Sequence, residues 1–185
     1  RGCEEGLFEP PDWPAPGGRG AFTDAAVNTC GVGSQLWSYL IGYDGDRIAG
    51  AGPQSWADFW DVRRFPGKRG IRKTPKYALE IALLADGVPT AQVYPLLRTR
   101  AGVDRAFRKL DELKPHVVWW SSVAQVPDLL GSGEVVMSVT SPGRLVVANR
   151  DEKRNFKLQW NGNIYAVDYW AILKNSPRKA EAMQF

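Results

Sequence analysis

Apolar positions follow two alternating patterns in this chain: short runs of branched and aromatic residues, and longer segments with helical spacing. The short runs predict strands, at residues 35–43, 71–73, 116–120, 135–140, 155–160 and 164–173. The helical spacing predicts helices, at residues 56–62, 76–85, 91–98, 103–113, 124–130 and 142–149. Strands that alternate with helices imply an α/β fold with a mixed, mostly parallel sheet flanked by helices.

Local signals define some of these elements further. Thr74-Pro75 predicts the start of the helix at 76–85, and Asn161-Gly162-Asn163 predicts a turn between the last two strands. In the helix at 103–113, one apolar stripe is expected to face the core; it consists of Ala106, Phe107, Leu110 and Leu113.

Both ends of the sequence resemble cut ends. The chain begins Arg1-Gly2-Cys3, and residues 178–185 read as a helix that has just begun after Ser176-Pro177. Residues 1 to about 34 have little periodicity. We therefore expect a fragment of a longer protein, in which a missing signal peptide says nothing about compartment.

Composition narrows the chemistry. The 185 residues are 44% hydrophobic and 24% charged, as in ordinary globular domains, and no apolar stretch approaches 18 residues. The chain has one histidine, His116, and two cysteines. These residues are too few for a histidine-rich or a CxxC-paired zinc site, and they leave little basis for a Ser-His-Asp triad. No cofactor and no metal are expected.

Ligands of open α/β sheets lie at the carboxyl ends of strands. Here that rule points to Lys73-Thr74, to Trp120-Ser121-Ser122 and to the segment 140–144. Arg144 follows a strand and opens a helix, so it could hold a carboxylate beside the helix N-terminus. The alternative is a helix N-cap by Ser141 with a surface arginine.

Asp168 lies inside a branched and aromatic strand, where acidic residues are depleted. A charge in that position has a partner or a ligand, so the alternative is a structural ion pair. Arg144 and Asp168 together would suit a zwitterion, with arginine on the carboxylate and aspartate on the ammonium.

Two residue pairs leave further alternatives open. Trp119 and Trp120 point to opposite faces of a strand, so one packs in the core and the other could line a cleft, unless both are core. Cys3 and Cys30 either close a disulfide loop or remain two buried thiols.

Two rival functions remain. The basic residues between 63 and 76, with nearby tryptophans, could bind nucleic acid, although interspersed acids favour a solvated face. An enzyme could use Asp168 with Glu4 or Glu5 as an acid/base pair, but the site loops offer no second well-placed carboxylate.

Three motifs together resemble bacterial extracellular solute-binding proteins of ABC importers. They are the run 53–61 ahead of Phe65-Pro66-Gly67-Lys68-Arg69, the run 133–137, and the run 164–172 around Asp168. The resemblance covers the whole chain and is closest to the spermidine/putrescine-binding branch, which includes relatives for γ-aminobutyrate and opine-like solutes.

This resemblance implies a single lobe, the second, of a type II periplasmic-binding-protein fold. Residues 1–34 would be a remnant of the first lobe and hinge approach, residues 35–173 the second lobe bounded by hinge strands, and residues 174–185 a helix returning to the first lobe. It implies no enzyme. The partners would be a small solute, the missing first lobe of the same protein and an ABC permease, with no nucleic acid; the fragment could form a homodimer.

The resemblance also implies a ligand site. Asp168 matches the family aspartate that holds a ligand amine, and Arg144 matches an arginine of the nearest branch. Weaker ligand candidates are Trp120, Tyr165, Ser121, Ser141 and Thr74. The loop 72–77 is basic where polyamine binders are acidic, which favours a ligand with a carboxylate and an amine, although a polyamine stays an alternative. The family implies the periplasm, with a signal peptide in the full-length precursor.

Overall fold

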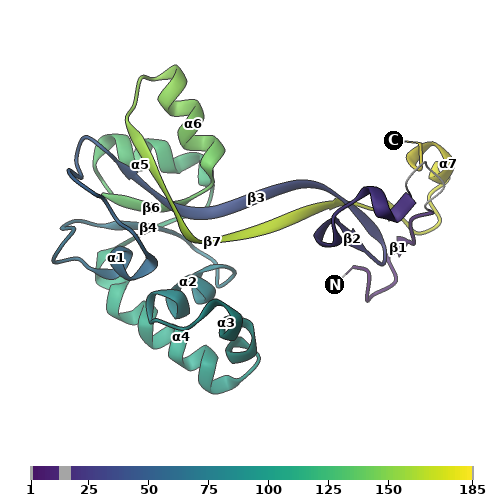
Figure 1. Cartoon of the computed structure of the whole chain (residues 1–185), viewed down its shortest axis with the longest axis horizontal. Coiled ribbons are helices and arrows are strands. Elements are labelled where there is room, and N and C mark those ends of the chain that lie inside the picture. Colours follow the sequence, from purple (N-terminus) through teal and green to yellow (C-terminus); the bar gives the residue numbers. More distant parts are fainter. Residues whose placement is uncertain (1, 13–17, 185) are drawn as a thin grey trace. The chain divides into compact units, whose positions relative to one another are not determined.

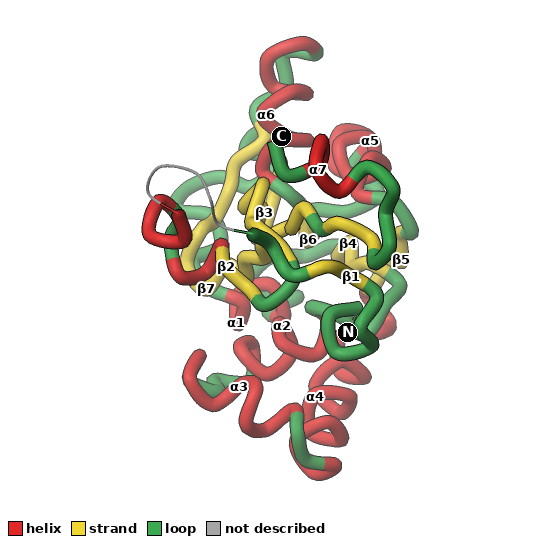
Figure 2. The backbone as a smooth tube through the Cα atoms, turned by 90° about the vertical axis from the view of Figure 1, so that its right-hand side faces the viewer, coloured by secondary structure: helices red, strands yellow, loops and turns green. Residues whose placement is uncertain are grey.

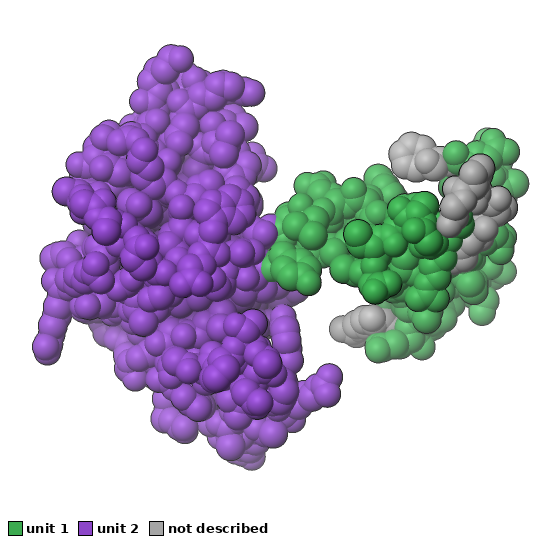
Figure 3. Space-filling model, in the orientation of Figure 1, with its two compact units in different colours: residues 1–37, 165–185 green, residues 38–164 purple. Residues whose placement is uncertain are grey.

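The computed structural model describes residues 2–12 and 18–184. They form two compact units (Figure 3). Unit 2 is the continuous segment 38–164, and unit 1 combines residues 1–37 with residues 165–185. The sequence placed the corresponding borders at 34/35 and 173/174.

Unit 2 is built on a mixed sheet. Its strands are β3 (Gly31–Asp44), β4 (Arg69–Arg72), β5 (Val117–Trp120), β6 (Met137–Thr140) and β7 (Phe156–Trp170), with β3 and β7 continuing into unit 1. The order is β3-β6-β4-β5, and β7 pairs with β3. β4 is parallel to both β5 and β6, whereas β3 is antiparallel to β6. The expected α/β class with a mixed sheet is confirmed.

Helices cover both faces of this sheet (Figures 1 and 2). The helices are α1 (Trp56–Trp60), α2 (Ala78–Ala85), α3 (Thr90–Leu97), α4 (Arg100–Leu113), α5 (Val126–Ser132) and α6 (Pro142–Asp151), with short 3-10 turns at Lys114–His116 and Val123–Gln125. α5 and α6 lie on one face and α1 to α4 on the other. One buried cluster joins α2, α3 and α4; it contains Ala82, Leu83, Val88, Val93 and Ala106.

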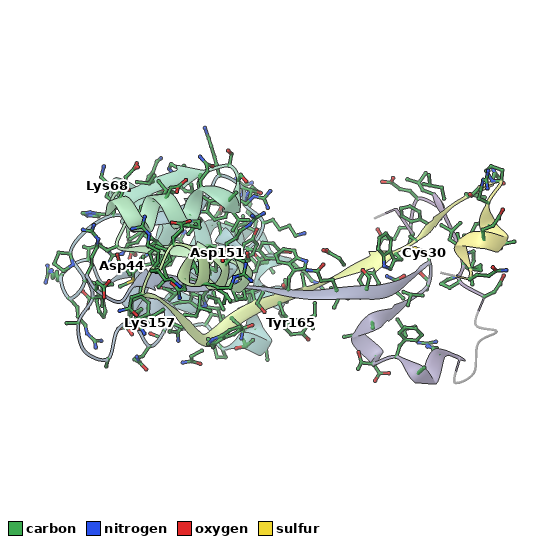
Figure 4. All side chains as sticks on the ribbon, turned by 90° about the horizontal axis from the view of Figure 1, so that it is seen from above. Cys30, Asp44, Lys68, Asp151, Lys157 and Tyr165 are labelled. Atoms are coloured by element: carbon green, nitrogen blue, oxygen red, sulfur yellow. A yellow bond between two sulfur atoms is a disulfide. The ribbon has the colours of Figure 1, made fainter. Side chains whose placement is uncertain are left out.

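Unit 1 is small and rich in short elements. Its elements are β1 (Phe8–Glu9), β2 (Val27–Asn28), β8 (Ile172–Leu173), α7 (Lys179–Ala182) and 3-10 turns at Gly18–Ala21 and Asp24–Ala26. β1 pairs with β8, and β2 pairs with the start of β3. A disulfide joins Cys3 to Cys30, the latter labelled at the start of β3 in Figure 4. This confirms the cystine alternative over two free thiols.

A buried arginine fixes the start of β4. Arg69 is 0% exposed, and its guanidinium donates to the carbonyl oxygens of Phe59 (2.9 Å), Gly67 (2.6 Å) and Asp61 (3.1 Å). Burial lowers the pKa of Arg69 to about 10, partly offset by the nearby Asp61 carboxylate. The side chain thus ties the end of α1 to the start of β4.

The predicted turn at 161–163 is wrong. β7 runs unbroken from Phe156 to Trp170, and Gly162 adopts a φ of 71°, which glycine reaches without a steric cost. The indole Nε1 of Trp56 donates to the Gly162 carbonyl oxygen at 2.7 Å. The turn-like sequence therefore lies within one strand, where the Trp56 side chain hydrogen-bonds to its central glycine.

Two helix details also differ from the expectation. α2 begins at Ala78, because Tyr77 occupies its N-cap in the left-handed conformation with a φ of 69°. In α4, Phe107 is 49% exposed while Ala106 and Leu113 are buried, so Phe107 does not belong to the core stripe.

Candidate functional site

Three parallel strands of unit 2 end at one edge of the sheet, which we call the ligand edge. β4, β5 and β6 end there at Arg72, Trp120 and Thr140. Since β3 is antiparallel to β6 and pairs Leu40 with Thr140, Tyr39 reaches the same edge. The carboxyl-end rule of α/β sheets marks this edge as the binding region of unit 2.

Arg144 lies on the first turn of α6, directly after β6. Its side chain is exposed and forms no hydrogen bond or ion pair with any residue that the structure describes. Ser141 is the N-cap of α6 and Arg144 is a surface arginine, as the alternative interpretation had it, although the Ser141 hydroxyl makes no capping bond. A guanidinium and a helix N-terminus are therefore both open to an anion here.

The other predicted contacts of unit 2 differ in accessibility. Thr74 follows β4, and its backbone N–H donates to the carbonyl of Arg72 at 2.8 Å. The Ser121 hydroxyl lies 3.3 Å from Oε1 of Gln125, so it already has an internal partner. Thr74, Ser121, Ser141 and Arg144 all follow strands that end at the ligand edge.

The tryptophan pair resolves into an exposed and a buried ring. Trp119 is 43% exposed and Trp120 only 1%. A Cβ atom added to Gly70 would lie 3.4 Å from the Trp120 ring, so that indole packs on the sheet. Its Nε1 is buried and has no hydrogen-bond partner among the described residues. Trp120 therefore offers a ligand almost no surface in this structure, and Trp119 is the accessible ring.

Asp168 and Tyr165 belong to the part of β7 in unit 1. Tyr165, labelled in Figure 4, is 59% exposed. The Asp168 carbonyl oxygen accepts a bond from the Ser34 hydroxyl at 3.2 Å, but its exposed carboxylate forms no ion pair with any described residue. The structural ion pair considered for Asp168 is thus not present within the described part of the chain.

The basic segment 63–76 does not form one continuous cationic face. Arg69 is fully buried, and Arg64 pairs with Asp58 at 2.9 Å. The cations that remain exposed at the ligand edge are Arg72, Lys73 and Lys76. Sequence reasoning missed the aromatic residues beside them, Tyr39 and Tyr77; the basic loop was the one available signal.

Unit 1 contains an apolar cavity of about 610 Å³. Its lining includes Phe22, Cys30, Trp170, Ile172 and Met183. Within residues 2–12 and 18–184, no group of three or more histidine, cysteine or acidic side chains could hold a metal ion. No helix in the same ranges is long and apolar enough to cross a membrane.

Comparisons with known proteins agree with this architecture. The chain is 48% identical over all 185 residues to the gamma-aminobutyric acid-binding protein of Pseudomonas aeruginosa, and covers 52% of that protein. Among solved structures, the PBP MotA from A. tumefaciens B6 in complex with glucopine matches 99% of the chain, with a TM-score of 0.84 and 34% identity, over 56% of its own length. A GABA receptor structure matches 98% of the chain with a TM-score of 0.86 and 34% identity, over 55% of its length.

The chain thus spans about half the length of these relatives, and their names describe binding proteins rather than enzymes. The family model described as bacterial extracellular solute-binding protein matches residues 4–185. With a mixed sheet, a cationic ligand edge and this match over nearly its whole length, the chain belongs to the bacterial extracellular solute-binding protein family.

Proposed function

We propose that this chain is the second lobe of a periplasmic solute-binding protein that delivers a small amine-containing solute to an ABC importer. The observation that carries the proposal is Arg144, an exposed guanidinium at the start of α6 with no ion pair among the described residues. An unpaired arginine at the carboxyl edge of parallel strands suits the carboxylate of a small solute.

The solute is best described as an amino acid of the γ-aminobutyrate type. Arg144 holds its carboxylate and Asp168 its ammonium group. Ser141 and Thr74 supply hydrogen bonds, Ser121 supplies one if it leaves Gln125, and Tyr165 supplies an apolar wall. Trp120 is buried, so it packs beneath the surface of this edge and does not contact the solute. The relative that binds gamma-aminobutyric acid supports this choice, and the cations after β4 disfavour a polyamine.

The missing first lobe of the same protein is the proposed partner for unit 1. The apolar cavity there, with Trp170 and Ile172 in its lining, supports a covering segment, because an open apolar hollow costs hydration free energy. A homodimer of the fragment is the other way to cover it. Closure of two lobes around the solute would be the functional event.

Titration calorimetry tests the proposal on a protein extended to the length of the relatives. The ligands are γ-aminobutyrate, putrescine and spermidine, and the variants are Arg144→Ala and Asp168→Ala. We expect tight γ-aminobutyrate binding, weakened at least 10-fold by either substitution, since each removes a charged contact of about 1.5–3 kcal/mol. The 185-residue chain alone offers half a site and should bind in the millimolar range or weaker.

Arg150→Ala is the matched control, because Arg150 is an exposed arginine on the same helix that pairs with Asp151 at 2.6 Å. It should leave affinity unchanged. Tight polyamine binding that survives Arg144→Ala would show that the arginine has no ligand role.

A further inference from the structure

Tyr77 has an unusual backbone at the ligand edge. It is one of three non-glycine residues with positive φ among those described, at 69°, and its side chain is buried at 7% exposure. A left-handed tyrosine is strained and persists only where its surroundings hold it. It sits in the loop after β4, five residues beyond Arg72, so the strain lies beside the proposed site.

The ring of Tyr77 packs on a second tyrosine. Its centroid lies 4.9 Å from that of Tyr39 with the planes tilted by 59°, a favourable aromatic arrangement. Tyr39 comes from β3 and Tyr77 from the loop after β4. The pair therefore joins two segments that meet at the ligand edge from different parts of the sequence.

Each tyrosine of the pair contacts a cation. Nζ of Lys76 lies 4.9 Å from the Tyr77 ring centroid, within the range of a cation–π interaction. Nη1 of Arg72 donates to the Tyr39 hydroxyl at 3.4 Å. Both cations are exposed, so each contacts one tyrosine while its charge stays accessible to solvent.

The surrounding loop is fixed and uniformly basic. The Lys73 backbone N–H donates to the Trp120 carbonyl oxygen at 2.9 Å, which ties the loop to the end of β5. Residues 72–79 contain three cations and no acid; Glu80 follows on the first turn of α2. Repulsion between like charges can exclude a competing ligand as effectively as attraction selects the right one.

We infer that Tyr39 and Tyr77 are specificity-determining positioning residues, which hold Arg72 and Lys76 as a cationic rim that admits solutes carrying an anionic group and rejects polycations. This inference rests on the proposed function and assigns the rejection to particular residues. Arg144 provides the attraction, whereas the rim provides discrimination between a zwitterion and a polyamine of similar length.

The test measures selectivity by calorimetry on the extended protein, as the ratio of γ-aminobutyrate affinity to spermidine affinity. Replacing both rim charges, Arg72→Gln with Lys76→Gln, should lower this ratio at least 10-fold. Tyr77→Gly removes the ring and relieves the positive φ, and should lower the ratio about 3-fold or more. Tyr77→Phe keeps the ring and should leave the ratio within 2-fold of the unsubstituted protein.

If Tyr77 had only a structural role, its substitution would lower the affinities for both ligands equally and leave their ratio unchanged. That result would overturn the inference. If the unsubstituted protein binds neither ligand, the proposed function fails, and the rim is then tested on the 185-residue chain by NMR. Glutarate should shift the amide signals of residues 72–74, 76 and 77, spermidine should not, and the double Gln variant should lose the glutarate response. No shift with glutarate would overturn the inference independently of the proposed function.

Discussion

The two ends of β4 carry arginines with opposite surroundings. At the start, Arg69 is fully buried and its guanidinium donates hydrogen bonds to three backbone carbonyls. At the end, Arg72 is exposed and makes one long bond to the Tyr39 hydroxyl. One strand of four residues thus separates an arginine that builds the lobe from one that is available to a ligand. Saturation of the donors, rather than residue type, distinguishes the two roles.

Acidic residues of unit 1 show the same contrast. Glu9 accepts a bond from the Asn175 backbone N–H at 2.9 Å and pairs with Lys179 at 3.5 Å. The Asp168 carboxylate is exposed and has no ion pair among the described residues. We therefore read Glu9 as structural and Asp168 as available for a ligand.

Substituting the two arginines of β4 should give the largest difference. Arg69→Met leaves three carbonyl groups without their charged donor and should reduce the free energy of unfolding by roughly 3–5 kcal/mol. Arg72→Met, a matched change at an exposed site, should cost less than about 0.5 kcal/mol. Urea denaturation of the 185-residue chain measures both. Equal losses would show that saturation of the guanidinium does not separate the two roles.

Two buried tryptophans provide a finer test of the same idea. Trp56 and Trp120 are 2% and 1% exposed, but only Trp56 has a described partner for its N–H, the Gly162 carbonyl. Because both changes to Phe shrink a buried ring alike, Trp56→Phe should cost about 1 kcal/mol more than Trp120→Phe. A larger loss for Trp120→Phe, in the same denaturation experiment, would mean that its N–H has a partner.

Acidification should test the structural role of Glu9, with a smaller effect on stability. The Asn175 backbone N–H, and then Lys179, hold the pKa of Glu9 below its ordinary value of 4.5. Glu9 therefore contributes stability that is present above about pH 4.5 and lost as pH falls through the lower pKa of the folded state.

Glu9→Gln should remove part of the acid sensitivity of thermal unfolding below pH 4.5. Calorimetric scans between pH 3 and pH 7 compare this variant with the unsubstituted protein. If Glu9→Gln left the pH dependence of thermal stability unaltered, Glu9 would have no structural role of this kind.

Elements whose signals are local were predicted correctly from the sequence. The prediction failed where contacts with distant residues determine the local conformation. Alternating runs located the strands of the sheet, and Pro142 marked the start of α6. Asn161-Gly162-Asn163 has the composition of a turn, but Trp56, more than one hundred residues earlier, holds Gly162 within β7. The start of α2 was misplaced because Tyr77 adopts the left-handed conformation at its N-cap, where its ring packs on Tyr39 of β3.

The candidate site was predictable only in part for the same reason. The carboxyl-end rule found Thr74, Ser121 and Ser141, since it needs only strand ends. Period-two alternation showed that Trp119 and Trp120 face opposite ways but did not say which one is buried. The structure buries Trp120, whose ring packs beside Gly70 of the neighbouring strand β4, a contact that the sequence does not show.

Unit 1 is formed by two chain segments that are far apart in the sequence, so its assembly is linked to the folding of unit 2. Pairing Phe8 with Leu173 closes a loop that contains the whole of unit 2, and the entropy cost of closing a loop grows with the logarithm of its length. Once unit 2 has folded and β7 pairs with β3, the effective loop is several-fold shorter and its closure costs about 1 kcal/mol less. We therefore expect unit 2 to fold before β1 pairs with β8.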